Sequence, residues 1–285
     1  MRFAVLSDIH SNHIALSACL AELAKEEVDG YFFLGDYVSD CPHPTKTMDL
    51  LKEIRDTKKA YFVRGNREES LLEYDMMENK DWKNSSYQGS LLYTYERLRK
   101  EDLEWFASMP NHQSIELPDG IKVMLAHGSP FETRDLLNAD EDITKEILDK
   151  IDEDYLFCGH THKQFVFHWE GKVLLNPGSI GVAIGPPKSA HYSIVEIENN
   201  GKMKVQQKFV EYDYNELKEE FLHSSLMQQG MMWPKNILKS IETGINYGPI
   251  CAKRAYEIAV EEQVPIKMYH VPERFWIRAA NELHI

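Results

Sequence analysis

Short apolar runs alternate with longer segments of helical periodicity in the first third of the chain. The runs at 3–6, 31–34 and 60–63 are each four residues long and end abruptly at polar residues or glycine, as buried strands do. Between them, residues 13–26 place apolar side chains at helical spacing, and 45–56 are also expected to be helical. This β-α-β-α-β order predicts an α/β fold with parallel strands.

The middle of the chain continues with helices and hairpins. Residues 68–109 read as a helical insertion, and a hairpin is expected over 113–127 with its turn at 118–120. A helix near 142–150 leads to a strand at 155–158. The remaining expected elements are two hairpins, which turn around 170–171 and 199–201.

The predicted secondary structure changes after residue 211, where strand patterns stop and helical patterns begin. Helices are expected near 213–224, 234–242, 249–262 and 272–283. We therefore divide the chain into an α/β domain of residues 1–211, with an insertion at about 68–110, and a helical extension of residues 212–285. The extension is expected to pack on the α/β core.

Composition and charge narrow the class of protein. The chain has 285 residues, 43% hydrophobic residues and a formal net charge of −14. The hydrophobic content predicts a packed core, and the negative charge argues against long nucleic acids as partners, since these favour basic grooves. A small phosphorylated ligand remains compatible, because bound metal ions outweigh distant surface charge.

The cysteine pattern and the first residues favour a cytoplasmic protein. The four cysteines form no CxxC pair, so buried, reduced thiols are expected. No apolar run is long enough to span a membrane, and the first run is too short for a signal peptide. The oligomeric state stays open.

Polar clusters fall where the expected strands end, which is the edge where α/β sheets bind ligands. They offer carboxylate, amide and imidazole groups without thiolates, a set that suits divalent iron, manganese, zinc, nickel or cobalt. In chain order they are Asp8-Ile9-His10, Gly35-Asp36, Gly65-Asn66, His127-Gly128 and Gly159-His160-Thr161-His162. Each cluster alone is weak evidence, but five in order predict a metal site.

The order D-x-H, G-D, G-N, H-G, G-H-x-H resembles that of the calcineurin-like metallophosphoesterases, over about residues 1–210. The segment Asn176-Pro177-Gly178-Ser179 adds to the resemblance. The chain looks most like the small bacterial and archaeal phosphodiesterase branch, in a subgroup that includes diadenosine-polyphosphate hydrolases. The resemblance implies a four-layer α/β/β/α sandwich.

The resemblance also implies two divalent metal ions. Asp8, His10, Asp36 and His162 would bind one ion, and Asp36 would bridge to a second that Asn66, His127 and His160 complete. Asp36, Asn66 and His127 are accordingly expected to be catalytic. Two ions roughly 4 Å apart can share a hydroxide that attacks phosphorus in line, and they stabilise the charge that develops.

Arg67 departs from the family pattern, because many members have a histidine after the G-N that protonates the leaving group. An arginine stays protonated and is no general acid, but it can clamp a phosphate through two parallel hydrogen bonds. We therefore expect Arg67 to be a catalytic residue that contacts substrate, and we expect leaving groups to depart without a proton. The alternative is a structural pairing of Arg67 with Glu68 or another acid.

Two further residues have open assignments. Asn12 either hydrogen-bonds a phosphate oxygen or caps the helix over 13–26. His43, in the loop 40–44 that is expected to border the pocket, either donates a proton or belongs to a rigid proline-bounded turn. The aromatic and methionine side chains of 68–109 and 212–285 either roof the site and stack on a base or pack between helices.

The leading hypothesis is a metal-dependent hydrolase of phosphodiester or phosphoanhydride bonds in a small nucleotide-like substrate. The main alternative is a phosphoprotein or phosphomonoester phosphatase. A non-catalytic interaction scaffold is less favoured because all seven ligand positions carry competent residues, and a nuclease is disfavoured by the net charge of −14.

Overall fold

The apolar runs form two five-stranded sheets in the computed structural model, which describes residues 1–198, 202–266 and 270–285. The first sheet contains, in spatial order, β10 (Met203–Glu211), β9 (Ser189–Ile197), β1 (Arg2–Leu6), β2 (Gly30–Phe33) and β3 (Ala60–Phe62). The second contains β4 (His112–Glu116), β5 (Lys122–Ala126), β6 (Tyr155–Phe157), β8 (Lys172–Pro177) and β7 (Gln164–Trp169).

Both sheets are mixed, and in each of them three neighbouring strands run parallel. β1, β2 and β3 pair in parallel, whereas β9 pairs antiparallel with both β1 and β10. In the second sheet β5, β6 and β8 run parallel, and β4 and β7 form antiparallel edges. The carboxyl ends of β1, β2 and β3 therefore open at one edge of the first sheet, and those of β5 and β6 at one edge of the second.

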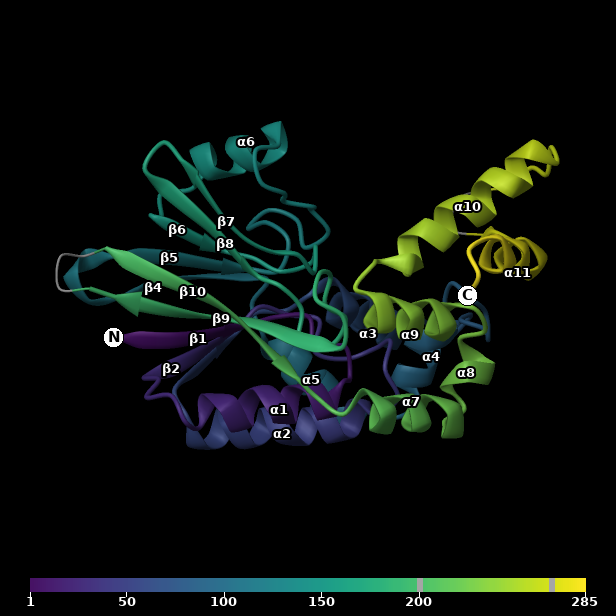
Figure 1. The fold of residues 1–285 in the computed structure, drawn as a ribbon, viewed down its shortest axis with the longest axis horizontal. Helices are drawn as coiled ribbons and strands as arrows, with labels where there is room; N and C mark the ends of the chain where they lie inside the picture. Colours follow the sequence, from purple (N-terminus) through teal and green to yellow (C-terminus); the bar gives the residue numbers. More distant parts are fainter. Residues whose placement is uncertain (199–201, 267–269) are drawn as a thin grey trace.

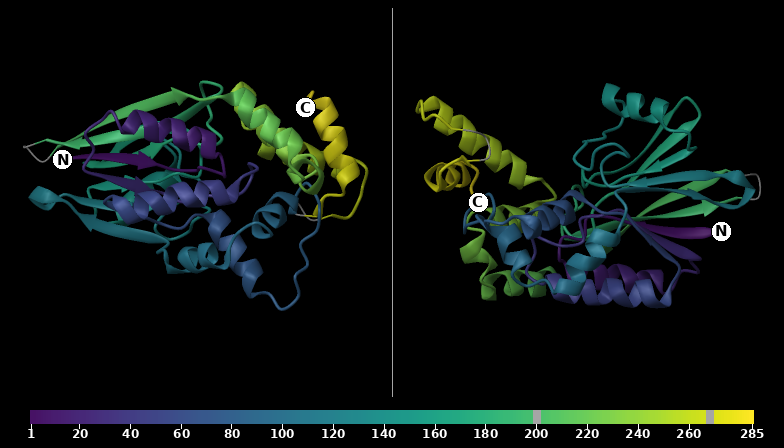
Figure 2. Two further views of the ribbon diagram at one scale, coloured as in Figure 1. Left: turned by 90° about the horizontal axis from the view of Figure 1, so that it is seen from below. Right: turned by 180° about the vertical axis from the view of Figure 1, so that it is seen from behind.

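Helices cover the outer face of each sheet, which gives four layers (Figures 1 and 2). Beside the first sheet lie α1 (His13–Leu23), α2 (Pro44–Thr57), α3 (Asn66–Met76) and α5 (Lys100–Ser108), whereas α4 (Gly89–Tyr95) lies farther from the sheet, beside the C-terminal helices. α6 (Asp142–Lys150) covers the second sheet. Phe3 and Phe32 of the first sheet meet Phe157 of the second in the apolar core between the sheets. The predicted four-layer α/β/β/α sandwich is confirmed.

The C-terminal part is helical, as predicted. It contains α7 (Tyr214–His223), α8 (Leu226–Gln229), α9 (Trp233–Thr243), α10 (Tyr247–Glu261) and α11 (Glu273–Glu282). Leu217 and Ile237 share an apolar cluster with Cys41 and Val182, so these helices pack directly on the α/β part. α10 and α11 form a second cluster of their own (Figure 1). The domain boundary at residue 211 stays a prediction.

Three details differ from the expected elements. The helical stretch over 68–109 divides into α3, α4 and α5, and the polar segment 77–88 between the first two has little apolar periodicity. The helix expected over 13–26 ends at Leu23, and the one-turn helix α8 was not expected. The hairpin turn at 199–201 lies outside the described residues, although β9 and β10 pair as predicted.

The four cysteines are buried and free, as expected. None of the helices in the described part of the chain combines the length and the apolar character needed to cross a bilayer.

Candidate metal centre

The seven predicted ligands follow the ends of the strands, as the sequence pattern indicated. Five of them have left-handed backbone conformations, which are uncommon for residues with a side chain. These are Asp8 (φ 54°), His10 (φ 50°), Asp36 (φ 54°), His160 (φ 62°) and His162 (φ 59°). Each such conformation costs on the order of 1–2 kcal/mol, and strain of this kind clusters at functional sites.

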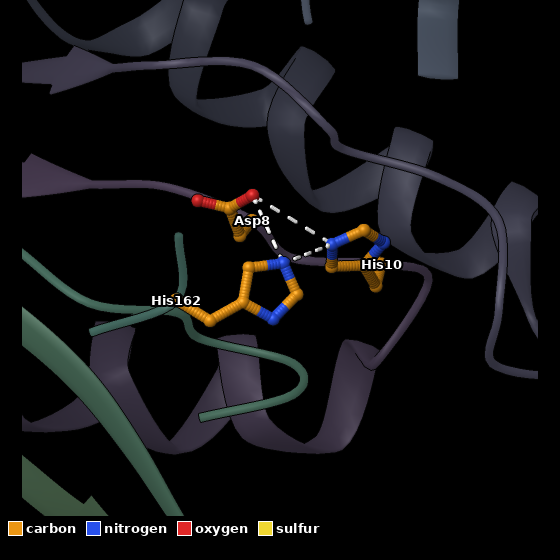
Figure 3. A group of neighbouring side chains, drawn as sticks. All are labelled: Asp8, His10 and His162. Atoms are coloured by element: carbon orange, nitrogen blue, oxygen red, sulfur yellow. Dashed lines mark hydrogen bonds and ion pairs between the residues drawn. The ribbon is translucent and has the colours of Figure 1, made fainter. Parts of the chain in front are cut away.

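Asp8, His10 and His162 form the first group of candidate ligands (Figure 3). Nε2 of His10 lies 3.0 Å from Nε2 of His162, and Oδ1 of Asp8 lies 3.3 Å from the latter atom. Nδ1 of His162 points at the carbonyl oxygen of Val182 at 2.8 Å, so Nδ1 carries the proton and Nε2 keeps its lone pair. This arrangement directs ligand atoms toward one point.

The first group fits a cation because its atoms lack other partners. Oδ1 of Asp8 is buried and has no hydrogen-bond partner within the described residues. Nδ1 of His10 lies 3.2 Å from Oδ2 of Asp40, a carboxylate–histidine contact that orients the ring with Nε2 toward the site. Buried polar atoms are otherwise almost always paired, and a divalent ion satisfies all three ligand atoms at once.

Asp36, His127 and His160 form the second group. Oδ2 of Asp36 lies 3.4 Å from Nε2 of His127, which is also 3.0 Å from Oδ1 of Asn66. Nδ1 of His127 faces the carbonyl oxygen of Leu34 at 2.8 Å, which again leaves Nε2 as the ligand atom.

Asp36 lies between the two groups. Its Oδ2 is 3.4 Å from Nε2 of His127 in the second group and 3.8 Å from Nε2 of His10 in the first. Asp36 is thus placed where a carboxylate shared by two ions would stand, and Asn66 lies beside the second group.

The buried carboxylates make this region strongly attractive to positive charge. Although burial opposes it, contacts with Asp40 and Asp8 raise the pKa of His10 to about 10. Burial likewise opposes the rise in the pKa of His127 to about 9, which Asp36 and Asp8 cause. Burial alone would raise the pKa of Asp36, but the neighbouring histidines hold it below its usual range. Binding of positive charge, whether protons or metal ions, therefore stabilises the cluster.

Two supporting groups fix the loops that carry the ligands. Glu68 is buried and accepts the backbone N–H groups of Gly65, Asp36 and Tyr37 at 2.8–2.9 Å. Ser179, in the N-P-G-S segment, donates to the carbonyl oxygen of Asp8 at 2.7 Å. The sequence showed these residues without indicating their roles, because Asp36 and Tyr37 lie more than 30 residues from Glu68, and Asp8 lies 171 residues from Ser179.

Arg67 lines a cleft of about 470 Å³ above the ligands. Its Nη2 donates to Oδ2 of Asp40 at 3.1 Å, and its Nε lies 3.9 Å from Oδ2 of Asp36. Glu68 accepts backbone N–H groups, so the acid that pairs with Arg67 is Asp40, as the structural-pairing alternative allowed, and a substrate contact of Arg67 stays a prediction. Asp40 also lines the cleft, so the loop 40–44 borders the pocket through this residue, as expected.

The phosphate-binding assignment of Asn12 was wrong, because the structure uses its side chain as a helix cap. Its Oδ1 accepts the N–H of Ala15, and its Nδ2 donates to the carbonyl oxygen of Gly181 and the hydroxyl of Tyr212. The side chain is fully buried, so no polar atom remains for a phosphate.

The structure places His43 in a proline-bounded turn, one of the two interpretations that the sequence left open for it. His43 precedes Pro44 at the start of α2, and its Nε2 lies 3.2 Å from Oε1 of Glu220 on α7. It lines a separate depression with Glu216, Glu220 and His223, away from the metal-ligand cleft. The proline-bounded turn is therefore the correct interpretation.

The fold and this cluster of ligands define a metallophosphoesterase. The profile of the calcineurin-like phosphoesterase superfamily domain matches residues 1–200. The chain belongs to this superfamily, and a metal-dependent phosphoesterase activity is supported by the family and by the two ligand groups.

Several proteins are similar to most of the chain. An uncharacterized protein of Methanocaldococcus jannaschii is 28% identical over 240 residues, which covers 78% of this chain and 93% of the relative. A hypothetical protein from Pyrococcus horikoshii has the same fold with a TM-score of 0.71 and 22% identity, covering 86% of this chain and 98% of its own. A metallophosphoesterase from Sphaerobacter thermophilus matches with a TM-score of 0.65 and 22% identity, covering 86% and 100%.

Proposed function

We propose that the protein is a dinuclear metal-dependent hydrolase of phosphodiester or phosphoanhydride bonds in a small nucleotide-like substrate. Asp8, His10 and His162 would hold one ion, His127 and His160 the other, with Asp36 shared and Asn66 completing the second set. Two divalent ions would supply an activated water and positive charge for the phosphoryl oxygens. Manganese, iron, zinc, nickel and cobalt all accept these nitrogen and oxygen ligands.

Arg67 is the observation that carries the substrate class. Its Nε is buried without a hydrogen-bond partner among the described residues, while Nη2 is fixed by Asp40. The guanidinium is thus oriented on the wall of the cleft, and because the side chain keeps 23% of its exposure to water, its N–H groups other than Nε are available to a phosphoryl oxygen. It binds and orients the phosphoryl group but transfers no proton.

The histidines that line the cleft are His10, His160 and His162, all proposed metal ligands. No further histidine among the described lining residues is free to protonate a leaving group. The proposed reaction therefore favours leaving groups that depart as stable anions, such as phosphates, nucleotides or phenolates. Alkyl phosphomonoesters and phosphoserine have leaving groups that need a proton, and no histidine of the cleft supplies one, which disfavours the phosphatase alternative.

The interaction-scaffold alternative is disfavoured for a different reason. All seven ligand positions carry competent residues, and five have strained backbone conformations. A scaffold without metal would have no use for such strain at so many ligand positions. The cytoplasmic location stays a prediction.

The test is a hydrolysis assay with manganese added to EDTA-treated protein. We expect bis(p-nitrophenyl) phosphate to be hydrolysed with a kcat/KM well above that for glycerol phosphate or phosphoserine. Asp36→Asn, which removes the proposed shared carboxylate charge, should abolish the metal-dependent rate. Faster turnover of the two alkyl monoesters would favour the phosphatase alternative, and a protein that binds no metal and hydrolyses nothing after manganese addition would favour the scaffold.

A further inference from the structure

The cleft above the metal ligands has an apolar wall as well as a polar one. Leu136, Trp233, Ile237, Pro249 and Ile250 line it together with the ligands and Arg67. Leu136 and Ile250 are 57% and 41% exposed. A bare phosphate or a purely polar ester would leave these aliphatic groups in water, whereas a ligand with an apolar face would cover them.

The two exposed side chains come from distant parts of the chain. Leu136 belongs to the loop between β5 and α6, and Ile250 lies near the start of α10, in the C-terminal helices. Figure 1 shows α10 extending away from the two sheets. A ligand that fills the cleft reaches both, so the C-terminal helices contribute directly to what the metal centre can accept.

The start of α10 is held in a fixed position relative to the metal ligands. Nε1 of Trp233 donates to Oδ1 of Asp40 at 2.8 Å, and the other carboxylate oxygen of Asp40 faces His10. A Cβ on Gly248 would lie 3.0 Å from the indole ring of Trp233, so the backbone of α10 packs closely on that ring. The apolar wall is therefore preorganised, which reduces the entropic cost of binding.

Polar groups on the same cleft fit the other parts of a nucleotide. Asn246 precedes α10, and its side-chain amide makes no hydrogen bond to any residue that the structure describes. Lys163, next to the ligand His162, is exposed and forms no ion pair within the described residues. A free amide suits the hydrogen-bonding edge of a base, and a free ammonium suits a phosphate. A lipid chain would use neither group.

From these contacts we infer that the cleft contains a nucleoside subsite, in which the base lies against Leu136, Pro249 and Ile250 and its polar edge meets Asn246. Lys163 binds a phosphate next to the one being hydrolysed, or the free phosphate of a nucleotide. The inference rests on the proposed function and deepens it, because it names the nucleoside as the recognised group. The C-terminal helices are then specificity elements of the hydrolase.

The test compares two phosphodiesters with the same leaving group, the p-nitrophenyl ester of thymidine 5′-phosphate and methyl p-nitrophenyl phosphate. Wild-type protein with manganese should prefer the nucleoside ester in kcat/KM by about tenfold or more, the scale of one good apolar contact. Ile250→Ser and Leu136→Ser should each lower this preference severalfold. Ile277→Ser is the matched control, because Ile277 is 42% exposed on α11 and does not line the cleft.

Binding provides a readout that needs no catalysis. Calorimetry with EDTA-treated full-length protein should show tighter binding of adenosine 5′-monophosphate than of ribose 5-phosphate, and Ile250→Ser should reduce the difference. Equal kcat/KM for both diesters, or an equal loss of preference in Ile277→Ser, overturns the subsite while the proposed function stands. Hydrolysis of neither diester overturns the proposed function, and the calorimetric comparison then decides on the subsite alone.

Discussion

Asp40 is a buried carboxylate that links the metal site to the C-terminal helices, and we predict two separable effects of Asp40→Asn. Its Oδ2 lies 3.1 Å from Nη2 of Arg67 and 3.2 Å from Nδ1 of His10. Its Oδ1 accepts Nε1 of Trp233 at 2.8 Å and the hydroxyl of Ser90 at 3.2 Å. The substitution preserves volume and removes the charge, so it leaves no cavity.

The first effect is on stability. Removing one partner of a buried ion pair costs about 3–5 kcal/mol. We expect the lower end, about 3 kcal/mol, because the side chain of Arg67 keeps 23% of its exposure to water. The measurement is urea denaturation of EDTA-treated wild-type and variant protein near pH 7, followed by circular dichroism.

The second effect is on metal affinity. His10 loses the carboxylate that orients its ring, and loss of such a supporting contact typically costs roughly 10–100-fold in metal affinity. Calorimetric titration of the EDTA-treated variant with manganese measures this loss. It should appear at the site that contains His10.

Asp102→Asn is the matched control for both effects. Asp102 is also buried and pairs with Lys52 at 2.6 Å and with Arg99 at 3.0 Å, but it lines no part of the metal cleft. It should lower stability by a similar amount and leave manganese affinity unchanged. An unchanged affinity in Asp40→Asn, or the same loss of affinity in Asp102→Asn, would show that Asp40 does not support His10 as a metal ligand.

Three further predictions follow from other contacts. Gly159→Ala should lower manganese affinity by at least tenfold in calorimetry, because the new Cβ would lie 2.0 Å from Oγ of Ser7 and 2.5 Å from Oδ2 of Asp8. A loss of this size is typical when a contact that supports a metal ligand is removed. An unchanged affinity would contradict this geometry. Burial lowers the pKa of His13 to about 4, so the unfolded chain binds an extra proton between pH 4 and about 6.5 and stability falls as the pH falls through this range. His13→Gln should therefore flatten the pH dependence of the urea midpoint there, and an unchanged slope would argue against a buried neutral His13. Arg67→His should raise the kcat/KM for glycerol phosphate relative to bis(p-nitrophenyl) phosphate by about tenfold or more, since general acids contribute roughly 10²–10⁴-fold; an unchanged ratio would show that the missing acid does not limit monoester hydrolysis.

The ligand positions were predictable because local signals mark them. Apolar runs end at Asp8, Asp36 and His127, and the carboxyl ends of parallel strands meet at one edge of a sheet. The fold class followed from the same alternation of strands and helices. Both were therefore present in the order of residues along the chain.

The supporting contacts were not predictable, because they join segments far apart in sequence. Asp40 and Trp233 are 193 residues apart, and no periodicity links them. An amphipathic helix shows that one of its faces is buried, without showing which surface it covers. The place of α9 and α10 beside the metal cleft thus required the structure.

Asn12 and His43 show how local sequence left two readings open. Both precede helices. For Asn12, capping and phosphate binding use the same side-chain amide, and for His43 the sequence of a proline-bounded turn does not show whether the imidazole faces the site. The side-chain amide of Asn12 donates hydrogen bonds to Gly181 and Tyr212, which hold it in its capping position. Glu220 on α7 pairs with His43. The deciding partners lie more than 160 residues away in each case.

The most direct test of the central claim is a manganese titration of EDTA-treated protein that follows hydrolysis of bis(p-nitrophenyl) phosphate, with Asp36→Asn measured in parallel. The proposed dinuclear function predicts no hydrolysis without metal, a rate that rises to saturation as two ions bind per chain, and no metal-dependent rate in Asp36→Asn. Hydrolysis that persists in EDTA, or that survives Asp36→Asn unchanged, would contradict it.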